Sequence, residues 1–190
     1  MRLIIMGPPG AGKGTQAKVV AARYGVPAIS TGDIFRANVG EGTPLGLEAK
    51  RYMDAGEYVP DEVTNQMVRD RLAETDCEPG FLLDGYPRTV AQVEVLDGIL
   101  AEAHCPLDAA LVLTVDDEEL VQRLLHRAQT EGRSDDTEEV IRKRQAVYNE
   151  QTAPLLETYD ARGLLVRVDG MGGVDEVSAR IGAALDAHRG

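Results

Sequence analysis

The chain has 190 residues, a length that fits one domain, and 43% of them are hydrophobic, so a substantial core can form. Its formal net charge of −12 disfavours nonspecific binding to nucleic acid or to an anionic membrane surface. Cys77 and Cys105 are far apart in sequence and lack the spacing of metal ligands. Because there is no signal peptide and no apolar run near the ~20 residues of a membrane span, we expect a cytoplasmic protein.

Short apolar runs alternate with helical patterns along the chain. Five strands interleaved with helices predict a parallel sheet covered on both faces, and such sheets bind ligands at the carboxyl ends of their strands. The expected strands are residues 3–6, 27–30, 80–84, 109–115 and 164–168. The expected helices are residues 14–24, 32–40, 44–55, 61–74, 90–103, 117–129, 137–160 and 174–188.

The glycine-rich segment 7–15 lies between the first strand and the helix 14–24. Phosphate-binding loops require this order of elements, because inward-facing backbone N–H groups and a helix N-terminus both attract an anion. Lys13 adds a point charge, so the segment predicts a site for nucleotide phosphates. Gly14 takes the place of the usual Ser or Thr after the lysine, and the hydroxyl comes later, at Thr15. A direct Mg²⁺ ligand from this loop is therefore unsupported.

Two segments interrupt the alternation and are predicted to be additions to the sheet. Residues 31–75 hold three short helices in succession, and residues 128–136 form a polar loop between two long helices. Lids and hinges occur in such additions, although a plain surface excursion is the alternative. At the start of the first addition, Ser30 or Thr31 can cap the following helix, and Arg36 one turn later indicates a second anion site.

The third expected strand ends in Asp84, beside the phosphate loop. A carboxylate at that position can organise Mg²⁺ or, alternatively, cap the next helix. Arg88 follows in the crevice, where a planar guanidinium can clamp a phosphate. Gln92 shares a face with it at i+4, and its amide could read the edge of a base. A surface ion pair and a solvated side chain are the alternatives for these two residues.

The third candidate cluster is basic. Arg123 and Arg127 face the same way at i,i+4, Arg133 lies in the polar loop, and Arg142 and Arg144 open the return helix. Salt bridges to acidic residues of the same helices are the alternative, with little energetic gain, and Arg142 fits that role. For the others we expect a second phosphate clamp, because a transferred phosphoryl group requires positive charge from several sides.

Together these motifs resemble the adenylate kinases, from residue 1 to about residue 170. Four motifs carry the resemblance: Gly-Pro-Pro-Gly-Ala-Gly-Lys-Gly-Thr at 7–15, Ser-Thr-Gly-Asp at 30–33, Leu-Asp-Gly-Tyr-Pro-Arg at 83–88 with Gln92, and Arg-Lys-Arg at 142–144. The pair Gly14-Thr15 is itself the family's form of the loop. Closure of a lid over the bound substrates is a well-known property of adenylate kinases, so the resemblance implies the same behaviour here.

The resemblance implies one P-loop kinase domain, a three-layer α/β fold with a five-stranded parallel sheet. Its core would span residues 1–29, 60–125 and 137–190, with a small helical AMP-binding insert at 30–59 and a lid at 126–136. Only five residues separate Arg127 from Arg133 and none of them is Cys. We therefore expect the bacterial short-lid form, without structural zinc.

The resemblance also implies partners and site residues. The reaction would be ATP + AMP ⇌ 2 ADP with Mg²⁺, in a monomer that binds neither nucleic acid nor membrane. The residues on the ATP side would be Gly10, Ala11, Gly12, Lys13, Gly14, Thr15, Arg123, Arg127 and the Gly172 backbone. Those on the AMP side would be Thr31, Arg36, Glu57, Tyr58, Val59, Gly85, Tyr86, Pro87, Arg88 and Gln92, with Arg133 and Arg144 bridging toward the AMP phosphate. The catalytic charges would be Lys13, Arg88, Arg123, Arg133 and Arg144, and Asp84 with Asp33 would orient Mg²⁺ through water.

Three other functions remain as alternatives. The nearest is a UMP/CMP-type nucleoside monophosphate kinase, a group that typically has Ala in place of Thr31 and Asn in place of Gln92, so both residues favour AMP. A nucleotide-dependent switch or binding module would have no second phosphate substrate for the second arginine cluster. A nucleic-acid-binding NTPase conflicts with the net charge of −12.

Overall fold

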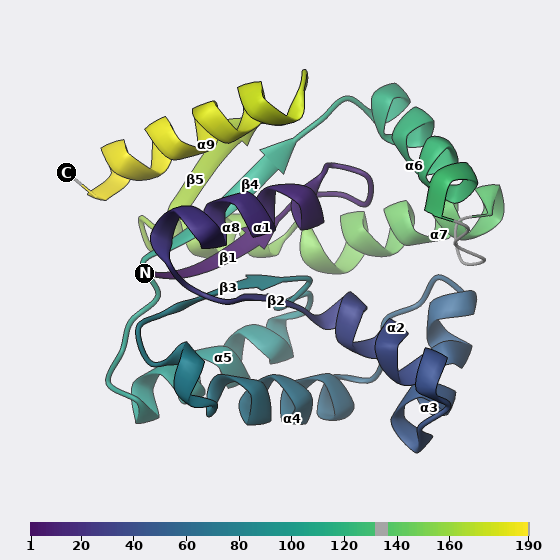
Figure 1. The fold of residues 1–190 in the computed structure, drawn as a ribbon, viewed down its shortest axis with the longest axis horizontal. Coiled ribbons are helices and arrows are strands. Elements are labelled where there is room, and N and C mark those ends of the chain that lie inside the picture. The colour runs from purple at the N-terminus through teal and green to yellow at the C-terminus, as the bar shows by residue number, and fades with distance from the viewer. Residues whose placement is uncertain (132–136, 190) are drawn as a thin grey trace.

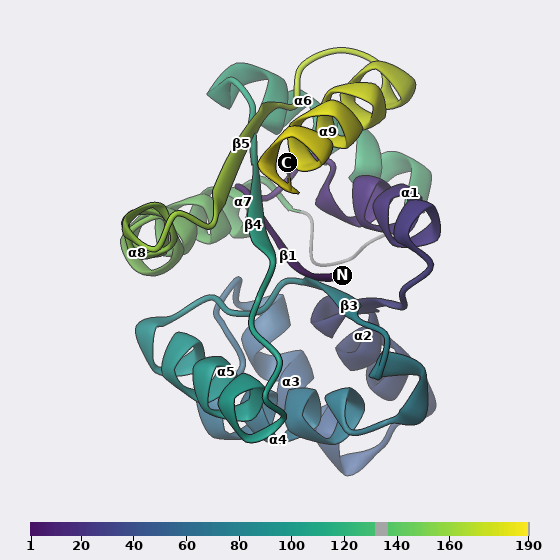
Figure 2. The ribbon, with the colours of Figure 1, turned by 90° about the vertical axis from the view of Figure 1, so that its left-hand side faces the viewer.

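The computed structural model describes residues 1–131 and 137–189, which form three layers with a parallel sheet between helices (Figures 1 and 2). The described strands are β1 (Arg2–Met6), β2 (Ala28–Ser30), β3 (Phe81–Asp84), β4 (Ala109–Thr114) and β5 (Leu165–Asp169). They pair in the order β2-β3-β1-β4-β5, and every pair is parallel. The predicted α/β class and five-stranded parallel sheet are confirmed.

Helices connect successive strands and return the chain to the end of the sheet at which the strands begin. Their bounds are α1 (Lys13–Tyr24), α2 (Thr31–Glu41), α3 (Pro44–Asp54), α4 (Asp61–Leu72), α5 (Val90–Glu102), α6 (Asp117–Glu131), α7 (Glu138–Val147), α8 (Leu155–Ala161) and α9 (Val174–Arg189), with a 3-10 turn η1 (Thr75–Cys77) and a π-helical segment η2 (Tyr148–Thr152). Within the described ranges, no helix is both long and apolar enough to cross a membrane.

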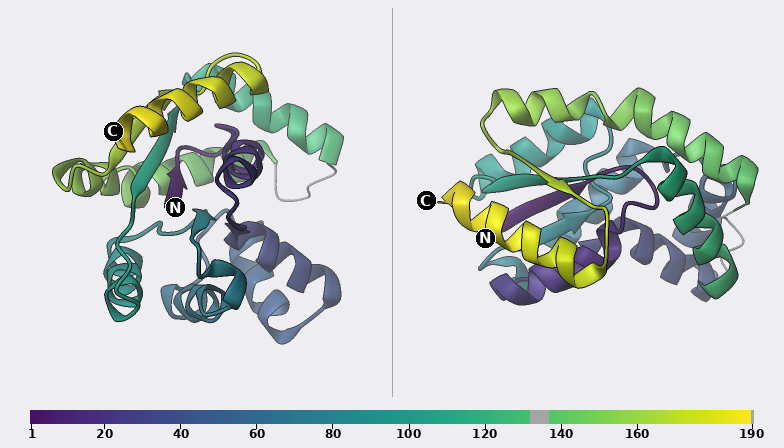
Figure 3. Two further views of the ribbon diagram at one scale, coloured as in Figure 1. Left: turned by 60° about the vertical axis from the view of Figure 1, so that its left-hand side comes forward. Right: turned by 90° about the horizontal axis from the view of Figure 1, so that it is seen from above.

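Strand β1 shows why both faces of the sheet are covered. Successive side chains of a strand point to opposite faces, so a strand that is apolar at every position needs cover on both sides. Leu3 and Ile5 pack in the cluster that contains α1 and α9, and Ile4 and Met6 pack in the cluster that contains α5 and α8. All four are at most 3% exposed. The two groups of helices lie on opposite sides of the sheet in the other views as well (Figure 3).

Helices α2 and α3 lie beside each other next to the β2 edge of the sheet (Figure 1). A small hydrophobic cluster around Phe35, Ala49 and Val59 joins the two helices to α4. The two helices approach closely at Gly46, where an added Cβ would collide with the backbone of Asn38. The α2–α3 hairpin is therefore closely packed internally and shares its small hydrophobic cluster with α4.

The segment predicted as one helix over residues 137–160 is divided in the structure. Helix α7 continues into the π-helical turn η2, and α8 begins after Pro154. Proline has no backbone N–H and clashes with the preceding turn, so it favours a break in a long helix. A π-helical turn holds an extra residue and is frequent at functional sites. The prediction of a continuous helix was therefore wrong at the position where the helix passes the candidate site.

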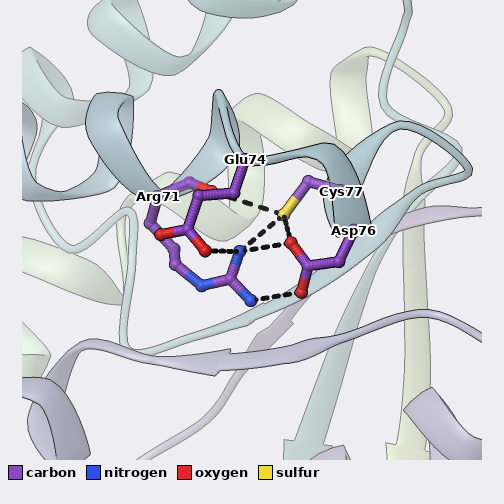
Figure 4. Close-up of polar contacts among 4 residues, drawn as sticks. All are labelled: Arg71, Glu74, Asp76 and Cys77. Carbon is purple, nitrogen blue, oxygen red and sulfur yellow. Dashed lines mark hydrogen bonds and ion pairs between the residues drawn. The ribbon is translucent and has the colours of Figure 1, made fainter.

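The two cysteines are free thiols in different surroundings. Cys77 is buried beneath Arg71, whose guanidinium donates to the Cys77 sulfur at 3.0 Å and binds Asp76 at 2.7 and 2.8 Å (Figure 4). Burial raises the pKa of the Cys77 thiol to about 11. The arginine thus fastens η1 to the end of α4, and the thiol stays protonated at neutral pH.

Candidate active site

The predicted motifs meet around a cavity of about 950 Å³. Its lining includes the last residues of β1, β2 and β3, so it lies at the carboxyl ends of the strands, as expected for a parallel sheet. The volume is at the upper end of the ~300–1,000 Å³ typical of small-molecule sites. The cavity is therefore large enough for a small-molecule ligand.

Most of the predicted site residues line this cavity. They are Gly10, Gly12, Lys13, Gly14, Thr15, Thr31, Asp33, Arg36, Glu57, Tyr58, Val59, Asp84, Gly85, Tyr86, Pro87, Arg88, Gln92, Arg123, Arg127 and Arg144. Ala11 is buried in the phosphate loop, where its N–H donates to Pro8 O at 3.1 Å, and does not reach the cavity surface. Gly172 lies in the loop after β5, outside the lining. Arg133 lies outside the described residues.

The loop between β1 and α1 has the backbone of an anion cradle. Gly10 and Gly12 have φ values of +88° and +89°, a region that side chains with a Cβ rarely adopt. A Cβ at Gly10 would also lie 2.9 Å from Leu124 Cγ on α6. The Lys13 ammonium folds back over the loop and donates to Gly7 O at 2.8 Å. Glycines at these positions let the loop curve and let α6 approach it.

The charge state of Lys13 is set by its surroundings. Its pKa falls from the ordinary value of 10.5 to about 8, chiefly because burial removes water from the ammonium. Asp84 opposes this effect and raises the pKa. The positive charges that lower it further are those of Arg88, Arg127 and Arg144. The Lys13 ammonium is thus buried among three arginines and one carboxylate that act on it.

Arg88 lies in the loop between β3 and α5. Its guanidinium stacks over the Tyr58 ring, 4.9 Å from the centroid, a cation–π geometry. Burial lowers the pKa of Arg88 from its ordinary value, and Arg144 and Arg36 lower it further, yet an arginine remains protonated in proteins. The structure thus contradicts the alternative of a surface ion pair and supports the predicted place of Arg88 in the crevice.

Gln92 is 1% exposed, so the alternative of a solvated side chain is wrong. Its Oε1 accepts from the Arg88 N–H at 2.7 Å, and its Nε2 donates to Asp61 Oδ1 at 2.8 Å. These two partners fix the orientation of the amide, because the opposite orientation would bring like groups together at both ends. The amide then has one further N–H and one further lone pair.

The start of α2 is built as predicted. Ser30 caps the helix by accepting from the Asp33 N–H at 3.2 Å, and Thr31, 2% exposed, donates to Gly85 O at 3.1 Å. Arg36 forms an ion pair with Asp33 at 2.6 Å. The arginine and the carboxylate that we expected in separate roles therefore face each other at the rim of the cavity.

The second arginine cluster mixes both predicted roles. Arg142 pairs with Glu138 at 2.7 Å on an exposed helix face, as expected. Arg123 also pairs with an acidic residue of its own helix, Glu119 at 2.8 Å, and donates to Gly170 O at 3.1 Å, but it lines the cavity. An arginine anchored in this way keeps its position beside the cavity.

Asp84 is the carboxylate whose position best suits a divalent cation. It ends β3 and faces the phosphate loop, since a Cβ added at Gly14 would lie 3.6 Å from its Oδ2. Among the described residues, no group of three or more His, Cys, Asp or Glu side chains could by itself hold a metal ion. Mg²⁺ usually binds through one or two carboxylates plus phosphates and water, so this donor set fits a cation that arrives with a nucleotide.

Several cavity residues were not identified from the sequence. Thr152 and Tyr148, from the π-helical segment, line the cavity, and Asp61 at the start of α4 holds Gln92. No motif contains these residues. The signal that could have indicated Thr152 is a small polar residue two positions before Pro154, where a helix is expected to break.

Comparison with known proteins shows which family this chain resembles. The family model described as adenylate kinase matches residues 5–164. A protein of Nocardioides sp. (strain ATCC BAA-499 / JS614) named adenylate kinase is 71% identical over 186 residues, which are 98% of this chain and 97% of that protein. Relatives with the same name from Kocuria rhizophila and Thermobifida fusca are 64% and 57% identical, over 97% and 99% of this chain and 98% and 100% of their own length. The chain belongs to the adenylate kinase family.

Proposed function

We propose that this chain catalyses the reversible transfer ATP + AMP ⇌ 2 ADP with Mg²⁺. Membership of the adenylate kinase family makes it a nucleoside monophosphate kinase, a phosphotransferase. The observation that carries the proposal is a phosphate loop that shares one cavity with cationic side chains from three other parts of the chain, Arg88, Arg127 and Arg144. Two phosphorylated substrates that exchange a phosphoryl group require charge stabilisation from several directions.

The chemistry needs little more than alignment and positive charge. The attacking atom is an AMP phosphate oxygen that is already anionic, so no general base is required. We assign Lys13 and the loop N–H groups of residues 10–15 to the ATP phosphates, and the Arg88 guanidinium to the AMP phosphate. Arg123, with Arg133 and Arg144, would stabilise the charge that develops during the transfer.

Mg²⁺ bound with the nucleotide would neutralise part of the phosphate charge. Asp84 is the residue that we assign to its water ligands, because the carboxylate already faces the phosphate loop. Asp33 would assist if its ion pair with Arg36 opens when AMP enters. Both assignments use water-mediated contacts.

The remaining functional proposals concern the two additions and the state of the protein. We assign AMP binding to the insert at residues 30–59, because Thr31, Tyr58 and Val59 line the cavity. A short lid at 126–136 without zinc would close over ATP. We further propose a cytoplasmic monomer whose partners are ATP, AMP and ADP, and the net charge of −12 supports the absence of nucleic acid.

The alternative of a UMP/CMP-type kinase is not favoured, because relatives 57–71% identical to this chain are named adenylate kinases. The test is ADP formation from MgATP with AMP, CMP, UMP, GMP or no acceptor. We expect strong turnover with AMP alone and near silence without an acceptor. Preference for CMP or UMP would overturn the specificity assigned to Thr31 and Gln92, and loss of ATP without any acceptor would overturn the transfer reaction.

A further inference from the structure

We propose that Thr152 and Tyr58 form a hydrogen-bond relay that positions Arg88 for phosphoryl transfer. This inference rests on the proposed kinase activity and assigns a role to a residue outside the family motifs quoted above. Thr152 belongs to the π-helical segment η2, and its side chain is buried, with 4% of its surface exposed. It acts through Arg88 and is thus a positioning residue.

The direction of the relay follows from the chemistry of its atoms. The Thr152 hydroxyl lies 2.8 Å from Arg88 O and 2.6 Å from the Tyr58 hydroxyl. A carbonyl oxygen can only accept a hydrogen bond, so the single Thr152 proton goes to Arg88. Tyr58 must then be the donor to Thr152. The proton order is Tyr58 to Thr152 to the Arg88 carbonyl, in which each bond polarises the next.

The other side of the same residue is also held by a buried side chain. The Arg88 N–H donates to Gln92 Oε1 at 2.7 Å, and Gln92 in turn donates to Asp61. Both backbone polar groups of Arg88 are therefore bonded to side chains from other elements. The loop between β3 and α5 is neither helix nor strand. These side-chain hydrogen bonds therefore take the place of the backbone hydrogen bonds that hold a helix or a strand.

Tyr58 restrains Arg88 in two ways, one direct and one through Thr152. Its ring lies under the guanidinium, 4.9 Å from the centroid, and its hydroxyl reaches the Arg88 carbonyl through Thr152. One side chain thus restrains both the charged end and the backbone of the arginine. Tyr58 lies in the segment after α3, so its position relative to η2 also links the insert to Arg88.

The π-helical turn explains why Thr152 is available for this role. Segment η2 continues α7, which carries Arg144, and it turns the chain before Pro154. The relay therefore ties the Arg88 loop to the element that carries a second cationic residue of the cavity. Because a displacement of 1 Å at a reacting group can cost about 10²-fold in rate, a fixed spacing between these two arginines matters for catalysis.

The test compares Thr152→Val, which keeps the shape but removes the hydroxyl, with Thr152→Ser, which keeps the hydroxyl. In the full-length protein we expect Thr152→Val to lower kcat by about tenfold or more, within the range that small misplacements produce, with KM for ATP nearly unchanged. Thr152→Ser should retain kcat within about twofold. Tyr58→Phe keeps the ring under Arg88 but removes the donor, and should give an intermediate loss.

Two further readouts separate positioning from a loss of structure. In an Arg88→Ala background, Thr152→Val should lower kcat no further, because the residue through which it acts is absent. Amide hydrogen exchange at residue 88 in the ligand-free protein should be faster in Thr152→Val than in Thr152→Ser, a result that does not depend on activity. Wild-type kcat in Thr152→Val, or an equal loss in the Arg88→Ala background, would overturn the relay while leaving the kinase reaction intact. An inactive wild-type protein would instead contradict the proposed function.

Discussion

The charge of Lys13 gives the sharpest pH prediction. Its ordinary pKa of 10.5 falls to about 8 in the folded protein, chiefly through burial. At ~1.4 kcal/mol per pKa unit, keeping this ammonium protonated at neutral pH costs the ligand-free protein roughly 3–4 kcal/mol. Because the folded state binds fewer protons than the unfolded state between pH 8 and 10.5, this group makes the folded state more stable as the pH rises through that window.

Binding of ATP should show the opposite trend. A phosphate favours the protonated lysine, so kcat/KM for ATP should be flat below a pH of about 8 and then fall, approaching tenfold per pH unit. Direct measurement of ADP by chromatography between about pH 6.5 and 9.5 avoids the pH limits of coupling enzymes. Lys13→Arg is the matched control, since a guanidinium stays charged across this range. A wild-type profile that stays flat to about pH 9.5, or an unchanged fall in Lys13→Arg, would refute the reasoning.

Three further predictions concern packing and burial. Gly46→Ala should lower Tm by several degrees, because the new Cβ would collide with the Asn38 backbone. Overpacking of this kind costs ~1–3 kcal/mol, and each kcal/mol lowers Tm by ~2–4 °C in a chain of this size. Thermal unfolding measures the change, and an unchanged Tm would contradict the close approach of the two helices. Gln92→Leu should lower Tm by a similar amount and raise KM for AMP, because it leaves buried polar partners unpaired at ~1–3 kcal/mol. An unaffected KM would argue against contact with AMP. In a thiol titration at about pH 8, Cys105 should react first and Cys77 only on unfolding, and rapid reaction of both would contradict the burial of Cys77.

The fold was predictable from sequence because its signals are local. The apolar run at 3–6 and the glycine-rich segment 7–15 specify a buried strand and a loop whose backbone must curve. The division of 137–160 was missed because a helical period continues on both sides of Pro154, and only packing decides how the chain passes it. Periodicity indicates which face of a helix is buried, but not where its axis shifts.

The candidate site was predictable where a motif places its charge. Asp84 ends β3, Lys13 follows β1 and Arg88 follows β3, so the topology of the sheet brings these residues to one cavity. The supporting contacts were not predictable, because Thr152 reaches Arg88 across 64 residues of sequence. Such a contact depends on the tertiary packing of a threonine that no motif contains. The charged residues of the site can thus be predicted from the sequence, whereas the residues that position them are identified only in the structure.

The central claim is that this cavity transfers a phosphoryl group from one nucleotide to another. The most direct test uses ATP labelled at the γ-phosphate with AMP, and follows the label in the presence of Mg²⁺. We expect the label to appear in ADP, with two ADP formed per ATP consumed and little inorganic phosphate. Label released as inorganic phosphate at the same rate with and without AMP would contradict the account.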